Sequence, residues 1–235
     1  MPAWNVDAVL LDMDGTLIDT EKVYLESTIA ALAACGYTDG VATLCQGMIG
    51  LPGPECDRLL RMHFGAEYPA DEVDRLYRAN CAELLAAGLP LKPGVIELLD
   101  AIEASGLPKA IVTAAARHTA AEHLGLAGIA HRFDAILTRD DVARSKPSPD
   151  LYLLAAKRLG VRPQDCVAIE DSNPGVAAAH AAGVITLMVP DILPPTDETR
   201  TRCAAVLPDL HAAIKLLTAR GALKSLAASD NRFIG

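Results

Sequence analysis

The chain has 235 residues, of which 51% are hydrophobic and 4% aromatic, and its formal net charge is −9. This composition is too apolar for a disordered chain and indicates an aliphatic core, as in helices packed on a buried parallel sheet. The acidic charge disfavours nucleic-acid binding through a basic face, and no apolar stretch approaches the ~20 residues that a membrane helix needs.

The predicted elements begin with a short apolar run at residues 9–11, which leads into an acidic turn and indicates a buried strand. Residues 20–88 show only helical patterns. One helix is predicted to end before Gly36, a second to follow the Pro-Gly-Pro sequence at 52–54, and a third to cover residues 73–85. This helical block contains no predicted strand.

From residue 91 onward, predicted strands and helices alternate. The strands are at residues 110–113, 135–137, 166–169 and 184–189, with helices after Gly94, at 119–124, near Pro149 and at 175–182. Such alternation produces right-handed βαβ units and a parallel sheet. The first strand must join this sheet, so the helical block is an insertion. We predict an α/β fold with a Rossmann-like core (residues 1–17 and 90–220), an inserted α-helical domain (18–89) and a C-terminal tail (221–235).

The six cysteines form no C-x-x-C pair and have no neighbouring histidines, which disfavours a zinc site. The N-terminal segment lacks basic residues and carries Asp7, Asp12 and Asp14, so it does not look like a secretion signal. Without export, a disulfide framework is not expected. These features predict a cytoplasmic protein with reduced thiols; they do not predict an oligomeric state.

Two carboxylates follow the first predicted strand. Asp12 and Asp14 are one residue apart, so their side chains project to the same side. Ligands of open α/β sheets bind beyond the carboxyl ends of the strands, and two carboxylates there repel each other unless a hard cation such as Mg²⁺ lies between them. Taken alone, the motif is also compatible with an ordinary acidic turn in which an Asp caps a helix.

Other predicted strands also end in polar residues. Thr113 offers a hydroxyl beside backbone N–H groups at a helix start, which suits an anion. Lys146 lies in a proline-bounded loop, which restricts its freedom. Glu170 and Asp171 close another strand and supply oxygen ligands. Together with the acidic turn, these residues predict a metal and anion site at one edge of the sheet.

The segments that carry these residues resemble the four motifs of the haloacid dehalogenase superfamily. They read DMDGTLIDTE at 12–21, IVT at 111–113, KPSPD at 146–150 and IEDS at 169–172. The chain is most similar to the group with a helical cap inserted after the first motif, which contains small-molecule phosphatases and β-phosphoglucomutase. The resemblance implies that the inserted helical domain is such a cap.

The resemblance also implies catalytic roles. Asp12 is expected to be the nucleophile that accepts the phosphoryl group as an aspartyl-phosphate, and Asp14 the general acid and base. Thr113, the backbone of Ala114 and Lys146 are expected to bind the phosphoryl oxygens.

The implied cofactor is Mg²⁺, held by Asp12, the backbone carbonyl of Asp14 and Asp171. Glu170 is expected to orient metal-bound water. The expected function is hydrolysis of a small phosphorylated metabolite, without nucleic-acid or membrane partners.

Alternative activities within the superfamily are less compatible with these residues. Dehalogenases need neither Asp14 nor a metal. Phosphonate hydrolysis needs a lysine in the cap, and Lys22 is in the wrong place. A β-phosphoglucomutase-like isomerase has a Ser-Arg pair shortly after a cap glycine, whereas here Gly50 is followed by Leu-Pro-Gly-Pro-Glu and the nearest arginines are Arg58 and Arg61.

The mutase stays the main enzymatic alternative. A non-catalytic Mg²⁺-binding interaction protein is a further alternative, although none of the motif residues is lost. Gly50, Arg58 and Arg117 are the candidates for substrate specificity.

Overall fold

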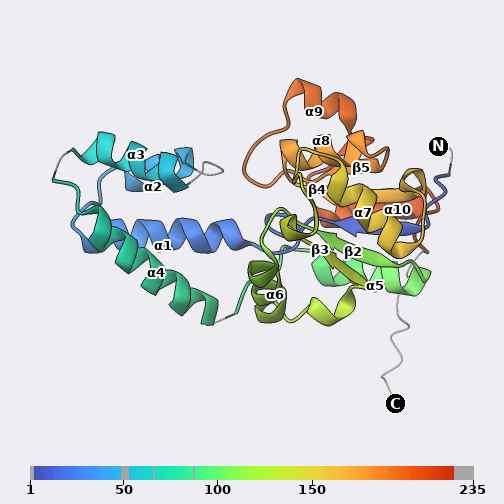
Figure 1. Cartoon of the computed structure of the whole chain (residues 1–235), viewed down its shortest axis with the longest axis horizontal. Coiled ribbons are helices and arrows are strands. Elements are labelled where there is room, and N and C mark those ends of the chain that lie inside the picture. Colours follow the sequence, from blue (N-terminus) through green and yellow to red (C-terminus); the bar gives the residue numbers. More distant parts are fainter. Residues whose placement is uncertain (1–2, 49–52, 66, 87, 225–235) are drawn as a thin grey trace, which may run out of the picture. The chain divides into compact units, whose positions relative to one another are not determined.

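The computed structural model describes residues 3–48, 53–65, 67–86 and 88–224 (Figure 1). The chain forms two compact units, divided at Ile18/Asp19 and at Pro90/Leu91. Residues before the first division and after the second make one unit, and the segment between them makes the other.

The larger unit contains a six-stranded sheet with the order β3-β2-β1-β4-β5-β6, in which every pair of neighbours is parallel. Its strands are β1 (Ala8–Leu11), β2 (Lys109–Val112), β3 (Ala135–Leu137), β4 (Cys166–Glu170), β5 (Ile185–Met188) and β6 (Ala205–Val206). The three central strands are completely buried, as expected for a parallel sheet that is covered on both faces. The predicted α/β fold with a Rossmann-like sheet is confirmed.

Helices connect these strands, and a last helix follows β6. They are α5 (Val95–Ser105), α6 (Arg117–Leu126), α7 (Asp150–Leu159), α8 (Asn173–Ala181), α9 (Asp197–Arg202) and α10 (Leu210–Ala219), with short 3-10 turns at Ala130–Arg132, Arg139–Asp141 and Pro163–Asp165. One side of the sheet packs on α7 and α8, since Leu10, Val112 and Ala168 share one buried cluster with residues of both helices. Right-handed crossovers place α5 and α6 on the other side.

The strand order brings the predicted site residues to one place. β1 lies at the centre, and Leu11 pairs with Ile111 of β2 on one side and with Ile169 of β4 on the other. The connections from β1 and β4 run in opposite directions, which makes this the switch point where open α/β sheets bind ligands. The residues that follow these strands therefore lie side by side at the carboxyl edge.

The inserted unit is entirely helical within its described residues. It consists of α1 (Thr20–Ala34), α2 (Val41–Gly47), α3 (Gly53–Phe64) and α4 (Ala70–Ala86), with α1 packed against α4. Its core contains Leu32, Val73 and a group of rings in which Tyr37 and Phe64 have centroids 4.2 Å apart.

Several elements were not predicted. α2 is a seven-residue helix that begins at a left-handed glycine, Gly40. α9 is polar throughout and depends on a Thr196 cap, so it shows no apolar periodicity. β6 has only two residues. The predicted tail begins with buried residues, because Ala222 and Leu223 fold back on α10, where the Leu223 N–H donates to the Leu217 carbonyl.

In the part of the chain that the structure describes, no helix combines the length and the apolar character that crossing a membrane requires. The cytoplasmic location stays a prediction.

Candidate active site

Lys146 connects the ends of three neighbouring strands. Its ammonium group donates hydrogen bonds to Asp12 Oδ1 after β1 and to Glu170 Oε1 at the end of β4, both at 2.5 Å, and to the carbonyl of Val112 in β2 at 2.7 Å. The side chain is 5% exposed. Burial disfavours the charged lysine, but the two carboxylates outweigh this effect and raise its pKa. The loop lysine is thus a fixed cation next to Asp12.

Glu170 is completely buried, and both of its oxygens have partners. Oε1 accepts hydrogen bonds from Lys146 and from the Tyr152 hydroxyl at 2.5 Å, and Oε2 accepts from the Ser172 hydroxyl at 3.1 Å. A Cβ at Gly175 would lie within 1.9 Å of this carboxylate, so only glycine fits there. Glu170 therefore anchors Lys146; its predicted contact to metal-bound water stays a prediction.

A group of acidic side chains lies beside Lys146. Asp12, Glu170 and Asp171 each place one carboxylate oxygen within 4.8 Å of the others. Burial, reinforced by Glu170, raises the pKa of Asp171 to about 7 against the opposing effects of the Thr16 hydroxyl and Lys146. Burial also raises the pKa of Asp12, although Lys146 opposes the shift. Three carboxylates around one ammonium leave an excess of negative charge that a divalent cation can neutralise.

The turn after Asp14 is shaped to fit this acidic group. Gly15 has φ +83°, and a Cβ there would lie 2.6 Å from Asp171 Oδ2. The next residue, Thr16, donates its hydroxyl to Asp171 Oδ1 at 3.0 Å. The absence of a side chain at Gly15 therefore leaves room for the second oxygen of Asp171.

A further, partly buried ion pair borders the same turn and was not predicted. Lys92 donates to Asp191 Oδ1, and the other oxygen, Asp191 Oδ2, is buried with no hydrogen-bond partner in the described part of the chain. This oxygen would lie 3.3 Å from a Cβ at Gly15. Neither residue belongs to a recognisable motif, so only the fold brings them here.

The side chain of Asp14 contacts a histidine, whereas that of Asp12 contacts Lys146. Asp14 Oδ1 lies 3.0 Å from Nδ1 of His123, a residue of α6 that is 3% exposed. The Asp14 side chain is 30% exposed and is not part of the acidic group. The two carboxylates of the DxD motif therefore have separate environments. His123 was missed by the sequence analysis because a single histidine in a helix carries no signal by itself.

The predicted anion-binding residues lie at the end of β2. Thr113 is buried, and its hydroxyl accepts a hydrogen bond from the Ala115 N–H at 3.0 Å. Its own N–H donates to the Leu137 carbonyl and is therefore occupied by the sheet. Within the described residues the Ala114 N–H has no acceptor. The Thr113 hydroxyl proton and the Ala114 N–H are thus the donors available to an anion here.

The predicted specificity residues have other partners. Gly50 lies outside the described residues. Arg58, in α3, donates to both carboxylate oxygens of Glu55 at 2.9 and 2.5 Å. Arg117, at the start of α6, donates to Asp141 at 2.6 Å. Substrate contacts by the two arginines stay predictions; Arg117 uses only one guanidinium nitrogen for Asp141, which leaves it other N–H donors.

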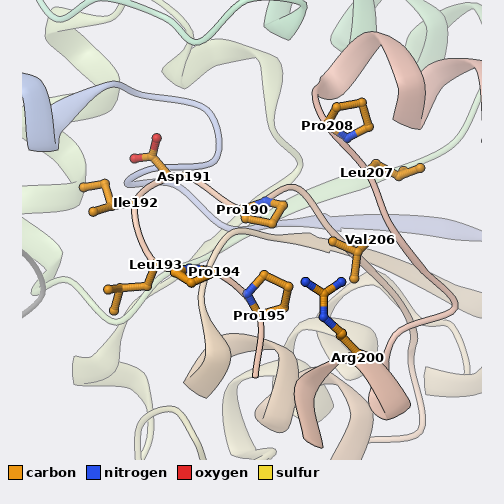
Figure 2. A pocket seen from close by; sticks show the side chains of 10 residues that line it. All are labelled: Pro190, Asp191, Ile192, Leu193, Pro194, Pro195, Arg200, Val206, Leu207 and Pro208. Carbon is orange, nitrogen blue, oxygen red and sulfur yellow. The ribbon is translucent and has the colours of Figure 1, made fainter. Parts of the chain in front are cut away.

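A cavity of about 470 Å³ lies beside the loop that follows β5 (Figure 2). Its walls are mainly apolar and include several prolines, with Arg200 on one side and Asp191 at one end. The loop is fastened to α8, because the Asn173 amide donates to the Pro194 carbonyl and accepts from the Thr196 N–H. Asp191, which lines the cavity, is also the residue whose Oδ2 lies beside Gly15 in the turn after β1.

Comparisons with known proteins agree with this geometry. A family model for haloacid dehalogenase-like hydrolases matches residues 6–183. A probable pseudouridine-5'-phosphatase of Drosophila melanogaster is 33% identical over 80% of this chain and 83% of its own length. A phosphorylated carbohydrates phosphatase of Thermotoga maritima is 30% identical over 76% and 82% of the two chains.

A solved structure has the same fold. The crystal structure of a haloacid dehalogenase family hydrolase from Deinococcus radiodurans, with bound phosphate and sodium, superposes with a TM-score of 0.83. The two sequences are 29% identical, and the match covers 94% of this chain and 98% of the other. The chain therefore belongs to the haloacid dehalogenase-like hydrolase family, as its motifs predicted, and is an enzyme of the phosphatase type.

Proposed function

We propose that the chain is a Mg²⁺-dependent phosphomonoester hydrolase in which Asp12 carries the phosphoryl group as an aspartyl-phosphate. The observation that supports this most strongly is the buried contact between Lys146 and Asp12, next to Asp171 and at the carboxyl edge of β1. A carboxylate held by a fixed cation beside further oxygen ligands is suited to phosphoryl transfer, which depends on positioning and on neutralising charge.

The residues present fit a magnesium ion. Asp12, Asp171 and the backbone carbonyl of Asp14 offer only oxygen atoms as ligands, which Mg²⁺ prefers. The negative charge of the carboxylates is also larger than the single positive charge of Lys146. When bound, Mg²⁺ neutralises negative charge on the carboxylates and the phosphoryl oxygens.

The protein's own groups divide the reaction between them. Asp12 attacks phosphorus while Lys146, the Thr113 hydroxyl and the Ala114 N–H hold the phosphoryl oxygens. Asp14 donates a proton to the departing oxygen of the substrate and later removes a proton from the water that hydrolyses the aspartyl-phosphate. This division requires two carboxylates in different environments. Lys146 contacts Asp12 and His123 contacts Asp14, so the two environments differ.

The proposed substrate is a small phosphorylated metabolite of the sugar-phosphate kind. The two named relatives, a phosphatase of phosphorylated carbohydrates and a probable pseudouridine-5'-phosphatase, support this class. We assign substrate selection to the inserted cap, residues 18–89, with Gly50 and Arg58 as candidates, and to Arg117 at the start of α6 in the core; residues 221–235 have no proposed role.

A mutase needs a cap group that holds the second phosphate of a bisphosphate intermediate. Arg58 is the nearest candidate, and its guanidinium is already paired with Glu55. This exposed pairing does not decide between the two activities, but the absence of a Ser-Arg pair after Gly50 in the sequence favours hydrolysis over isomerisation.

A panel of phosphorylated metabolites tests the proposal. With Mg²⁺, release of inorganic phosphate from at least one sugar phosphate is expected, and chelation should abolish it. Ca²⁺ should not replace Mg²⁺, because its larger and more flexible coordination shell lets it engage both oxygens of the nucleophile. Isomerisation of a sugar phosphate without phosphate release would favour the mutase, and no turnover across the panel would favour a non-catalytic protein.

The raised pKa of Asp171 predicts a pH-dependent effect of Mg²⁺ on stability. Since its pKa rises from 3.8 to about 7 on folding, the ionised form destabilises the metal-free fold, and the free energy of unfolding in chelator should fall as the pH rises through this interval. Saturating Mg²⁺ should restore about 3 kcal/mol at about 100 times its Kd, and less below about pH 7, where a proton competes for Asp171.

Chemical unfolding in chelator and in Mg²⁺ across this pH range measures the effect. Asp171→Asn is the control, since it should remove the part of the pH dependence that Asp171 contributes and leave the part that comes from the raised pKa of Asp12. An Mg²⁺ effect that is equal at acidic and alkaline pH would argue against Asp171 as a ligand.

A further inference from the structure

His123 is a buried histidine that none of the sequence motifs includes. Its side chain is 4% exposed, and it reaches from α6 to the turn after β1, where Nδ1 lies 3.0 Å from Asp14 Oδ1. Asp14, by contrast, is 30% exposed. The histidine is therefore more deeply buried than the carboxyl group that it contacts.

The hydrogen bond distinguishes the two oxygens of Asp14. An imidazole that carries its proton on Nδ1 donates to Oδ1 when Asp14 is ionised. The same donor can stay on Oδ1 when Asp14 is protonated, provided that the acidic proton is on Oδ2. One tautomer of His123 is thus compatible with both protonation states of Asp14.

We propose that His123 is a positioning residue for Asp14: it holds Oδ1 and makes Oδ2 the oxygen that exchanges the proton. The inference rests on the proposed acid and base role of Asp14. In the first step the Oδ2 proton moves to the ester oxygen as its bond to phosphorus breaks and the bond from Asp12 forms. In the second step a water proton moves to Oδ2 as the water oxygen bonds to phosphorus and the bond from Asp12 breaks.

Positioning matters here because the terminal torsion of an aspartate is broad and nearly two-fold. Without a partner on Oδ1, the carboxyl group can rotate and turn the protonated oxygen away from the substrate. Misplacement of a catalytic group by about 1 Å can cost about a hundredfold in rate. The effect should be largest for substrates whose departing oxygen needs a proton.

The test compares an alkyl phosphate, β-glycerophosphate, with p-nitrophenyl phosphate, whose departing oxygen needs little protonation. The ratio of the two kcat/KM values reports phosphoryl transfer to Asp12, since both substrates form the same intermediate. His123→Leu is expected to lower kcat/KM about tenfold to a hundredfold for the alkyl ester and less than about threefold for the aryl ester. In His123→Asn the amide nitrogen can replace Nδ1 as donor. The ratio of the two kcat/KM values in this variant should therefore be close to that of the unaltered protein.

The controls separate positioning from loss of structure. A merely structural histidine would affect both substrates equally, because a fraction of misfolded protein leaves the ratio unchanged. His180→Leu, a matched change at an exposed histidine of α8, should behave like the unaltered protein. An unchanged ratio in His123→Leu overturns the inference. If the unaltered protein hydrolyses neither of these esters nor any member of the metabolite panel, the proposed function fails instead.

Discussion

Asp12→Asn is expected to reduce phosphatase turnover to the uncatalysed background while leaving the protein folded. The amide cannot form the acyl-phosphate, so the covalent route is lost altogether. The fold should survive because burial raises the pKa of Asp12, which means that its ionised form opposes folding near neutral pH. Lys146 also keeps its bonds to Glu170 and to the Val112 carbonyl in this variant.

Turnover of an alkyl and an aryl phosphate, together with the unfolding transition, measures both parts of this prediction. Asp7→Asn is the matched control, since Asp7 is an exposed aspartate that precedes the same strand. Substantial activity in Asp12→Asn would show that Asp12 is not the nucleophile.

Lys146→Met is expected to damage both activity and stability. A methionine fills a similar volume but leaves Asp12 and Glu170 without their common cation. Loss of one donor to the transferring group typically lowers kcat by about 10²–10³-fold. Removing one partner of a buried ion pair costs about 3–5 kcal/mol, because the remaining charge is buried and unpaired.

Steady-state kinetics measures the expected fall in kcat, and urea unfolding measures the expected loss of stability. Lys157→Met, at an exposed lysine of α7, is the control. The loss of stability should shrink at acidic pH, where Asp12, whose pKa burial raises, takes up a proton. A variant as stable as the control near neutral pH would show that Lys146 does not neutralise them.

The parallel sheet and the edge of it that carries the site were predictable from the sequence. Each central strand is a continuous apolar run that ends in a polar residue, and parallel strands bring such ends together. This reasoning places Asp12, Thr113, Glu170 and Asp171 at one edge, as the structure does. It uses only the period of the strands and the position of the residue that follows each one.

The contacts made from helices were not predictable in this way. His123 reaches Asp14 only because of the rotation of α6, and Tyr152 reaches Glu170 only because of the rotation of α7. Arg117 looked available to a substrate, but the 3-10 turn after β3 presents Asp141 to it. Such partners depend on helix rotation and turn geometry, which apolar periodicity does not specify.

The central claim, that Asp12 carries the phosphoryl group, is tested most directly by trapping the intermediate. Asp14→Asn cannot activate water but keeps Asp12, so the aspartyl-phosphate should accumulate with an activated substrate such as p-nitrophenyl phosphate. The measurement is intact-mass spectrometry after rapid acid quench, followed by peptide mapping. The account predicts one added phosphoryl group in Asp14→Asn, located on Asp12, and none in the Asp12→Asn/Asp14→Asn double variant. A phosphoryl group on another residue, or one that persists in the double variant, would contradict it.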